Sequence, residues 1–80
     1  EEFCVILPNC NLEGAAGLAE RLRNGIEKEA IELDDQNVTV TASFGVAEYR
    51  QDEPASQFIE RTDQALYQAK KNGRNRVEIS

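Results

Sequence analysis

The sequence has 80 residues, with nine Lys and Arg against fifteen Asp and Glu, a formal charge of −6 and no His. This length fits one small domain or part of one. Without His, and with Cys4 and Cys10 too far apart for a CxxC pair, the chain excludes zinc-finger spacing, a haem ligand pair and a His-based triad. Its longest apolar run, residues 3–7, is far shorter than the roughly 20 residues that cross a bilayer, so we expect no membrane segment.

The charge is unevenly distributed along the chain. Residues 1–53 carry four bases and twelve acids, a net charge of 4 − 12 = −8, whereas residues 54–80 carry five bases and three acids, a net charge of 5 − 3 = +2. Four of these bases, Lys70, Lys71, Arg74 and Arg76, fall within a stretch that contains no acid. A basic cluster suits phosphate groups, but the surrounding negative charge disfavours long nucleic acid. We therefore expect a small phosphorylated ligand and no nucleic acid polymer.

The two cysteines do not indicate a disulfide framework. Cys4 lies inside an apolar strand pattern, where a thiol acts as a small hydrophobe, and Cys10 lies in a predicted loop. We interpret both as reduced, structural thiols, and reduced thiols are typical of a cytoplasmic protein.

In the first half of the chain, the apolar run at residues 3–7 predicts a strand covered on both faces. Asn11 can cap a helix that extends to about Ala30, because apolar residues recur there at spacings of three and four. Residues 32–37 are typical of a polar turn. Residues 38–46 then alternate apolar with small or polar side chains, which predicts a second strand.

In the second half, Pro54 is suited to the first turn of another helix. The predicted inner stripe of that helix consists of Phe58, Thr62, Ala65, Leu66 and Ala69. Lys70 and Lys71 fall in its last turn, Gly73 can supply the left-handed cap, and residues 77–79 can form a short strand. The resulting β-α-β-α-β order predicts an α/β sandwich, with no repeat or linker to mark a second domain.

Several blocks along the chain now form a pattern. They are EFCVILP at residues 2–8, AERLR at 19–23, TVTASFGVA at 39–47, TDQALYQAK at 62–70 and GRNRV at 73–77. Together they closely resemble the C-terminal part of GGDEF domains, the diguanylate cyclases, and Glu1-Glu2-Phe3 resembles the end of the GG(D/E)EF signature. The departures are few: Thr62 stands where the family usually has Ala, and Phe44 where Ile is common.

The resemblance implies that residues 1–80 are the C-terminal part of a single GGDEF domain. The implied fold is a partial ferredoxin-like or nucleotide-cyclase palm, with the first strand of the full domain missing. The implied activity is the condensation of two GTP into cyclic di-GMP and pyrophosphate between two facing GGDEF domains, with Mg²⁺ (or Mn²⁺), and the fragment alone is expected to be inactive. Two alternatives stay open: a degenerate GGDEF domain that binds GTP or cyclic di-GMP as a sensor or mediates dimerisation, and an α/β interaction module.

The resemblance also assigns site residues. Glu1 and Glu2 match the two acidic signature positions, which implies catalytic and metal-binding roles that suit a hard cation such as Mg²⁺; two Glu at a terminus are otherwise often merely solvated. Lys70 and Arg74 match the family's phosphate contacts, and an ammonium with a forked guanidinium suits a triphosphate. The alternative is that cations at a helix C-terminus only stabilise its dipole, and this is how we interpret Lys71 and Arg76.

The remaining polar residues are assigned structural roles. We expect Asn75 to complete a turn after the Gly cap, and Tyr67 to hydrogen-bond to backbone or to a carboxylate such as Asp63. Glu20, Arg21 and Arg23 are typical of a solvated, mixed-charge helix face.

Overall fold

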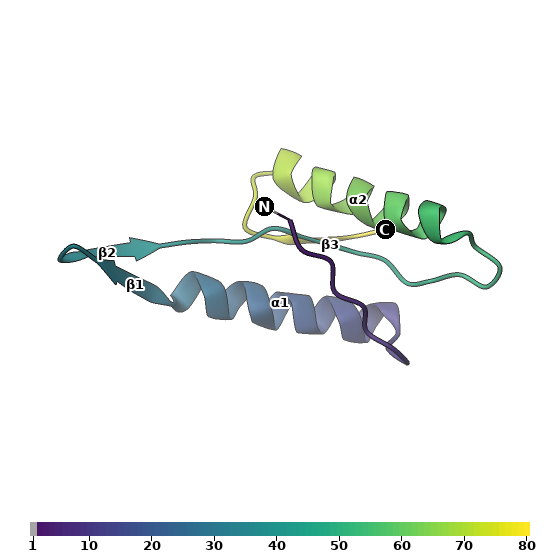
Figure 1. Cartoon of the computed structure of the whole chain (residues 1–80), viewed down its shortest axis with the longest axis horizontal. Helices are drawn as coiled ribbons and strands as arrows, with labels where there is room; N and C mark the ends of the chain where they lie inside the picture. The colour runs from purple at the N-terminus through teal and green to yellow at the C-terminus, as the bar shows by residue number, and fades with distance from the viewer. Residues whose placement is uncertain (1) are drawn as a thin grey trace.

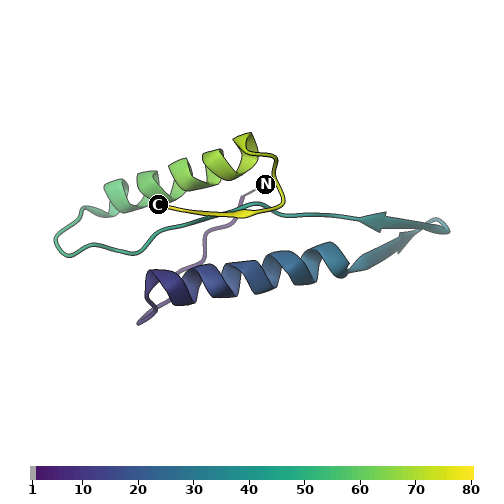
Figure 2. The ribbon, with the colours of Figure 1, turned by 180° about the vertical axis from the view of Figure 1, so that it is seen from behind.

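The computed structural model describes residues 2–80, so that Glu1 lies outside the described residues. The elements in chain order are α1 (Leu12–Lys28), β1 (Ala30–Leu33), β2 (Gln36–Thr39), β3 (Phe44–Val46), α2 (Ala55–Lys71) and β4 (Val77–Ile79). They form two small sheets, an antiparallel β1–β2 pair and a parallel β3–β4 pair. The β3–β4 pair runs between the two helices, with α2 on one side and α1 on the other (Figures 1 and 2).

Helix α1 begins at the cap that the sequence predicts. Asn11 is extended, and its side-chain oxygen accepts a hydrogen bond from the backbone N–H of Gly14 at 2.8 Å. The backbone N–H of Leu12 donates to the carboxylate of Glu48 at 2.9 Å, which ties this helix end to the segment after β3. Two of the four N–H groups that a helix start leaves unpaired are thereby satisfied.

Helix α2 connects two parallel strands. It begins after Pro54, and β3 and β4 pair in the register Phe44 with Val77 and Val46 with Ile79. Its C-terminal end is closed by Gly73, whose φ of 122° suits glycine, and by the N–H of Arg74, which donates to the carbonyl of Ala69 at 2.9 Å. This is the helix stop that Gly73 predicts.

The core of the described chain is made of small residues. The buried apolar side chains are Ala19, Ala65 and Ala69, and α2 lies directly against β3. At the point of contact, a Cβ on Gly45 would lie only 2.5 Å from the carbonyl oxygen of Thr62 and 2.8 Å from the Cα of Leu66. Glycine at this position is therefore required for helix and strand to approach so closely.

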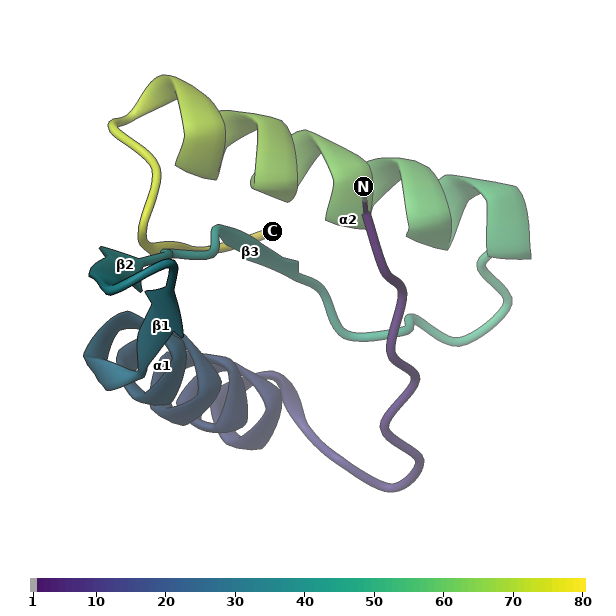
Figure 3. The same cartoon turned by 60° about the vertical axis from the view of Figure 1, so that its left-hand side comes forward.

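The predicted strand at residues 3–7 is not formed. Phe3 is 88% exposed and Ile6 79% exposed, and no backbone hydrogen bond joins this segment to another described strand. Figure 3 shows it crossing from the start of α1 towards α2, apart from β3. A strand exists only if a neighbour pairs with it, and residues 2–80 offer this segment none. The expectation that Cys4 packs as a small buried hydrophobe is wrong for the same reason, because Cys4 is exposed.

The turn predicted at residues 32–37 is instead a β-hairpin. Only Asp34 and Asp35 form the turn, with φ of 51° and 66°, the left-handed pair that a two-residue hairpin turn needs. The strand predicted at residues 38–46 is split, because β2 pairs with β1 and β3 pairs with β4, so the residues between them belong to neither sheet. The observed element order therefore differs from β-α-β-α-β, although the mixed α/β class is as expected.

The hairpin makes the molecule long and narrow, 52 × 24 × 18 Å along its principal axes. It extends beyond the end of α1, away from the two helices (Figure 1).

Among the described residues, none of the helices has the length and apolar character needed to cross a membrane.

Candidate functional site

The predicted phosphate-binding residues lie at the C-terminal end of α2. Lys70 is in the last turn of the helix, and Arg74 follows the Gly73 cap with a left-handed φ of 64°. Among residues 2–80, the structure gives the Arg74 side chain no ion pair or hydrogen bond, and Arg74 is exposed. The guanidinium is thus available to an anion at this end of the molecule.

Glu2 also reaches this place. A carboxylate oxygen of Glu2 lies 2.6 Å from Nζ of Lys70. The hydrogen bond and the positive charge of Lys70 hold the pKa of the Glu2 carboxyl below its usual range. Two of the four predicted site residues are therefore in direct contact, while Glu1, the predicted catalytic and metal-binding partner of Glu2, lies outside the described residues.

The metal that the resemblance implies can be tested against the donors present. Within residues 2–80, no three His, Cys, Asp or Glu side chains lie together as a metal site. Mg²⁺, however, is usually held by one or two carboxylates together with substrate phosphates and water. The Glu2 carboxylate beside the predicted phosphate-binding Lys70 fits that kind of shared site, and it does not fit a site built from protein ligands alone.

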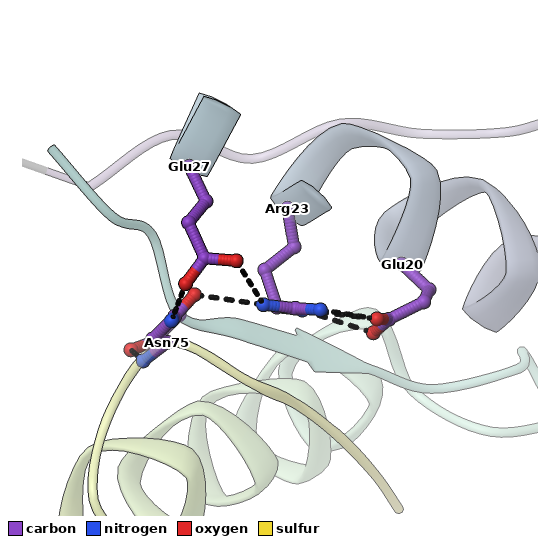
Figure 4. Close-up of polar contacts among 5 residues, drawn as sticks. Glu20, Arg23, Glu27 and Asn75 are labelled. Atoms are coloured by element: carbon purple, nitrogen blue, oxygen red, sulfur yellow. Dashed lines mark hydrogen bonds and ion pairs between the residues drawn. The ribbon is translucent and has the colours of Figure 1, made fainter. Parts of the chain in front are cut away.

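Asn75 links the segment after α2 to α1 (Figure 4). Its side-chain amide donates to Glu27 at 2.5 Å, and its side-chain oxygen accepts from Arg23 at 2.9 Å. Its backbone N–H donates to the hydroxyl of Ser43 at 3.1 Å. The structural role expected for Asn75 is observed, but through partners that the sequence did not indicate.

Arg23 does not lie on a solvated outer face, so that prediction is wrong. Only 16% of its side chain is exposed, and its guanidinium pairs with Glu20 and Glu27 on the same helix as well as with Asn75. The hydrogen bond between Arg23 and Glu20 raises the pKa of the Arg23 guanidinium and holds the pKa of the Glu20 carboxyl below its usual range. The spacing of Glu20, Arg23 and Glu27 by three and four residues was the available signal, because it brings them to one helix face.

Another ion pair, with little exposed side-chain surface, was not predicted from the sequence. Arg61 on α2 pairs with Glu53 at 2.6 Å, and the two side chains are only 13% and 5% exposed. Arg61 also donates to the backbone carbonyl of Glu48 at 2.8 Å and to the hydroxyl of Ser80 at 3.2 Å. This arrangement ties the β3–α2 connection to the end of β4, far from Lys70 and Arg74 along α2.

The remaining residues to which the sequence assigns structural roles lie outside the candidate site. Arg76 donates to the carbonyl of Asn72 and lies 3.6 Å from Glu78, so it closes the helix end as expected, and Lys71 is exposed. Within the described chain, Tyr67 is exposed and its hydroxyl makes no hydrogen bond to backbone or to a carboxylate, contrary to expectation. Cys4 and Cys10 are both free thiols.

Comparison with known sequences identifies the family. The model for the diguanylate cyclase GGDEF domain matches residues 1–76. Diguanylate cyclase A of Treponema denticola is 46% identical over 81 residues, which cover 100% of this chain and 22% of that protein. Diguanylate cyclase DgcP of Pseudomonas aeruginosa is 39% identical, covering 100% of this chain and 12% of its own length. The chain thus spans less than a quarter of the length of these relatives.

Solved structures agree with the sequence relatives. The GGDEF domain of DgcB from Caulobacter crescentus, in complex with c-di-GMP, has a TM-score of 0.87 and 29% identity, covering 91% of this chain and 43% of that one. Diguanylate cyclase SiaD of Pseudomonas aeruginosa, in complex with its activator SiaC, has a TM-score of 0.85 and 36% identity, covering 92% and 28%. These matches confirm the expected partial cyclase palm fold. With most of its length matched by both sequence and structure, the chain belongs to the GGDEF domain family.

Proposed function

We propose that this chain supplies the phosphate-binding part of a diguanylate cyclase site, in which two GTP are condensed into cyclic di-GMP and pyrophosphate. The observation that carries the proposal is the grouping at the end of α2, where Lys70 and the exposed Arg74 lie within three residues of the helix terminus and Glu2 contacts Lys70 at 2.6 Å. An ammonium and a guanidinium offer charge-assisted hydrogen bonds to phosphate oxygens. The relatives named as diguanylate cyclases support this activity.

Lys70 and Arg74 are assigned to the terminal phosphates of GTP. Glu1 and Glu2 are assigned to the catalytic and metal-binding positions, with Mg²⁺ (or Mn²⁺) as the cation. When bound, the cation would neutralise charge that develops on the attacked phosphate. The Glu2 carboxylate, now paired with Lys70, would have to share that lysine with the incoming phosphates.

The proposed partner is a second GGDEF domain, because each GTP in this reaction attacks the other across a homodimer. We propose that the reaction takes place in the cytoplasm, where GTP is available. The solved structure of the DgcB domain with c-di-GMP supports a nucleotide of this class as the ligand.

The test is a chromatographic assay for cyclic di-GMP with GTP and Mg²⁺, on the full-length protein that carries this chain. Formation of cyclic di-GMP supports the cyclase. Binding of GTP or cyclic di-GMP without turnover would favour the alternative, a degenerate GGDEF domain that acts as a sensor or dimerisation module. The 80 residues alone are expected to give no product, since they correspond to 43% of the solved DgcB chain.

A further inference from the structure

The backbone that carries Arg74 is held in an unusual conformation. Arg74 and Asn75 are consecutive non-glycine residues with left-handed φ values of 64° and 48°. Non-glycine residues with a positive φ are uncommon. They persist where surrounding contacts hold the backbone in that conformation, and they cluster at functional sites. Gly73 before them already has a positive φ of 122°. Three consecutive residues therefore turn the chain sharply between α2 and β4.

Each side of this turn is fixed by a different part of the molecule. On the helix side, the N–H of Arg74 donates to the carbonyl of Ala69 at 2.9 Å. On the strand side, the backbone N–H of Asn75 donates to the hydroxyl of Ser43, and the Asn75 side chain makes hydrogen bonds to two residues of α1. Arg74 thus sits between two anchors, and its side chain is the part that stays unengaged among residues 2–80.

The anchor on α1 is built to hold an amide. Glu27 accepts from the Asn75 amide at 2.5 Å, and Arg23 donates to the Asn75 oxygen at 2.9 Å. Arg23 is itself fixed by two carboxylates. Its Nε donates to Glu20 at 3.1 Å, and its Nη1 lies 3.6 Å from a carboxylate oxygen of Glu27. Figure 4 shows these contacts as one network, in which Glu27 joins both Arg23 and Asn75, and Arg23 also joins Glu20. An aspartate at position 75 would offer oxygen where Glu27 needs a donor, so only an amide satisfies both neighbours.

We propose that Glu27 and Asn75 are positioning residues for Arg74, so that α1 sets where the phosphate-binding guanidinium stands. This takes as given the phosphate role proposed above for Arg74. In this role both residues act by holding the backbone that carries Arg74, and the role requires no contact of their own with the nucleotide. Helix α1 is then part of the site's support, although neither Lys70 nor Arg74 belongs to it.

The experiment compares Asn75→Gly, Arg74→Ala and the double variant in the full-length protein, with KM for GTP and kcat measured for each. Glycine keeps the left-handed backbone accessible while removing the amide. Asn75→Gly removes both side-chain hydrogen bonds to α1. The resulting freedom of the Arg74 backbone is expected to raise KM about three- to tenfold, a change of the size that one ordinary hydrogen bond makes. In the Arg74→Ala background, the same change is expected to alter KM by less than about twofold, because the residue it positions is gone.

A second pair of variants guards against a folding defect at position 75. Glu27→Gln keeps an oxygen that can accept from Asn75 and is expected to retain KM, whereas Glu27→Ala is expected to raise it. Glu13→Ala, on the same helix but not in contact with Asn75, is the matched control. The positioning role is overturned if Asn75→Gly raises KM equally with and without Arg74, or if neither Asn75→Gly nor Glu27→Ala raises KM.

The same data separate this inference from the proposed function. If Arg74→Ala leaves KM unchanged, the phosphate role of Arg74 is wrong and the positioning role is overturned with it. If Arg74→Ala raises KM but the effect of Asn75→Gly is simply additive, the phosphate role stands and the positioning role alone is wrong.

Discussion

The ammonium of Lys70 lies 2.6 Å from the carboxylate of Glu2, although 68 positions separate the two residues in the chain. The two side chains are 36% and 56% exposed, so this ion pair contributes little to the stability of the fold. Its significance is positional, because it joins the acidic signature segment to the basic end of α2. A phosphate that binds Lys70 must compete with Glu2 for the same ammonium.

We expect Lys70→Ala and Arg74→Ala each to reduce kcat/KM for GTP in the full-length protein. A hydrogen bond to a charged group contributes about 1.5 to 3 kcal/mol, which corresponds to a reduction of roughly ten- to a hundredfold. Lys71→Ala is the matched control, since Lys71 is an exposed neighbour in the same helix turn, and it is expected to change little. Steady-state kinetics with GTP and Mg²⁺ make the comparison. Wild-type kinetics in all three variants would contradict the phosphate role and leave these basic residues with a role in capping α2 only.

Gly45→Ala is expected to destabilise the chain. The new Cβ would lie 2.5 Å from the Thr62 carbonyl oxygen, which is backbone and cannot rotate away. Overpacking of this kind costs about 1 to 3 kcal/mol. Gly25→Ala is the control: it lies in α1 with nothing within 4 Å of the added Cβ. There, alanine is expected to raise stability by about 0.5 to 1 kcal/mol. Urea unfolding of both variants checks the opposite signs.

Acidification is expected to weaken the Glu53–Arg61 pair. The hydrogen bond from Arg61 holds the pKa of the Glu53 carboxyl below its usual range, against the effect of burial. Because the folded-state pKa is the lower one, the pair stabilises the fold above the ordinary Glu pKa of about 4.3 and loses that effect as the pH falls further.

The stabilisation by the Glu53–Arg61 pair can be followed by measuring Tm at pH values from 7 down to 3, for wild type and for Glu53→Gln. The variant is expected to melt at a lower temperature at pH 7, and the gap between the two proteins should narrow at the acidic end. Glu60→Gln, an exposed neighbour on α2, serves as the control and should follow the wild type. A gap that stays constant over the whole pH range would contradict the ionic origin of the effect.

The exposed segment at residues 3–7 is expected to make the 80-residue chain self-associate. Phe3, Val5 and Ile6 are 88%, 73% and 79% exposed, and their backbone lies outside both sheets of the described structure. An extended apolar segment without a partner is a template for pairing with another chain. Sedimentation at increasing concentration tests this, and Val5→Lys should lower the association. A monomer that stays compact at every concentration would show the expectation to be wrong.

Local signals in the sequence were sufficient for both helices. The Asn11 cap, the Pro54 start and the Gly73 stop are each set by residues within a turn of the helix end, and the structure has all three. The assignment of Lys70 to the last turn of α2 followed from the same signals, whereas its site role came from the family motif.

The errors concern contacts between distant parts of the chain. Whether residues 3–7 form a strand depends on a neighbour elsewhere, and the apolar run alone cannot supply that information. The Asp34-Asp35 turn lacks the glycine that usually marks a two-residue hairpin. The link from Arg23 to Asn75 joins residues 52 positions apart, so the charge pattern on α1 was taken for a solvated face.

The β1–β2 hairpin has few contacts outside its own two strands. Its stability is therefore local, and it can open without disturbing the packing of α2 on β3. Its amide protons should exchange with solvent ahead of those in the helices. The Asp34-Asp35 tip is also the place where extra residues cost least, because doubling the length of a flexible loop adds only about 0.6 kcal/mol of closure entropy. A fluorescent or affinity label inserted there would report on the domain while leaving the end of α2 untouched.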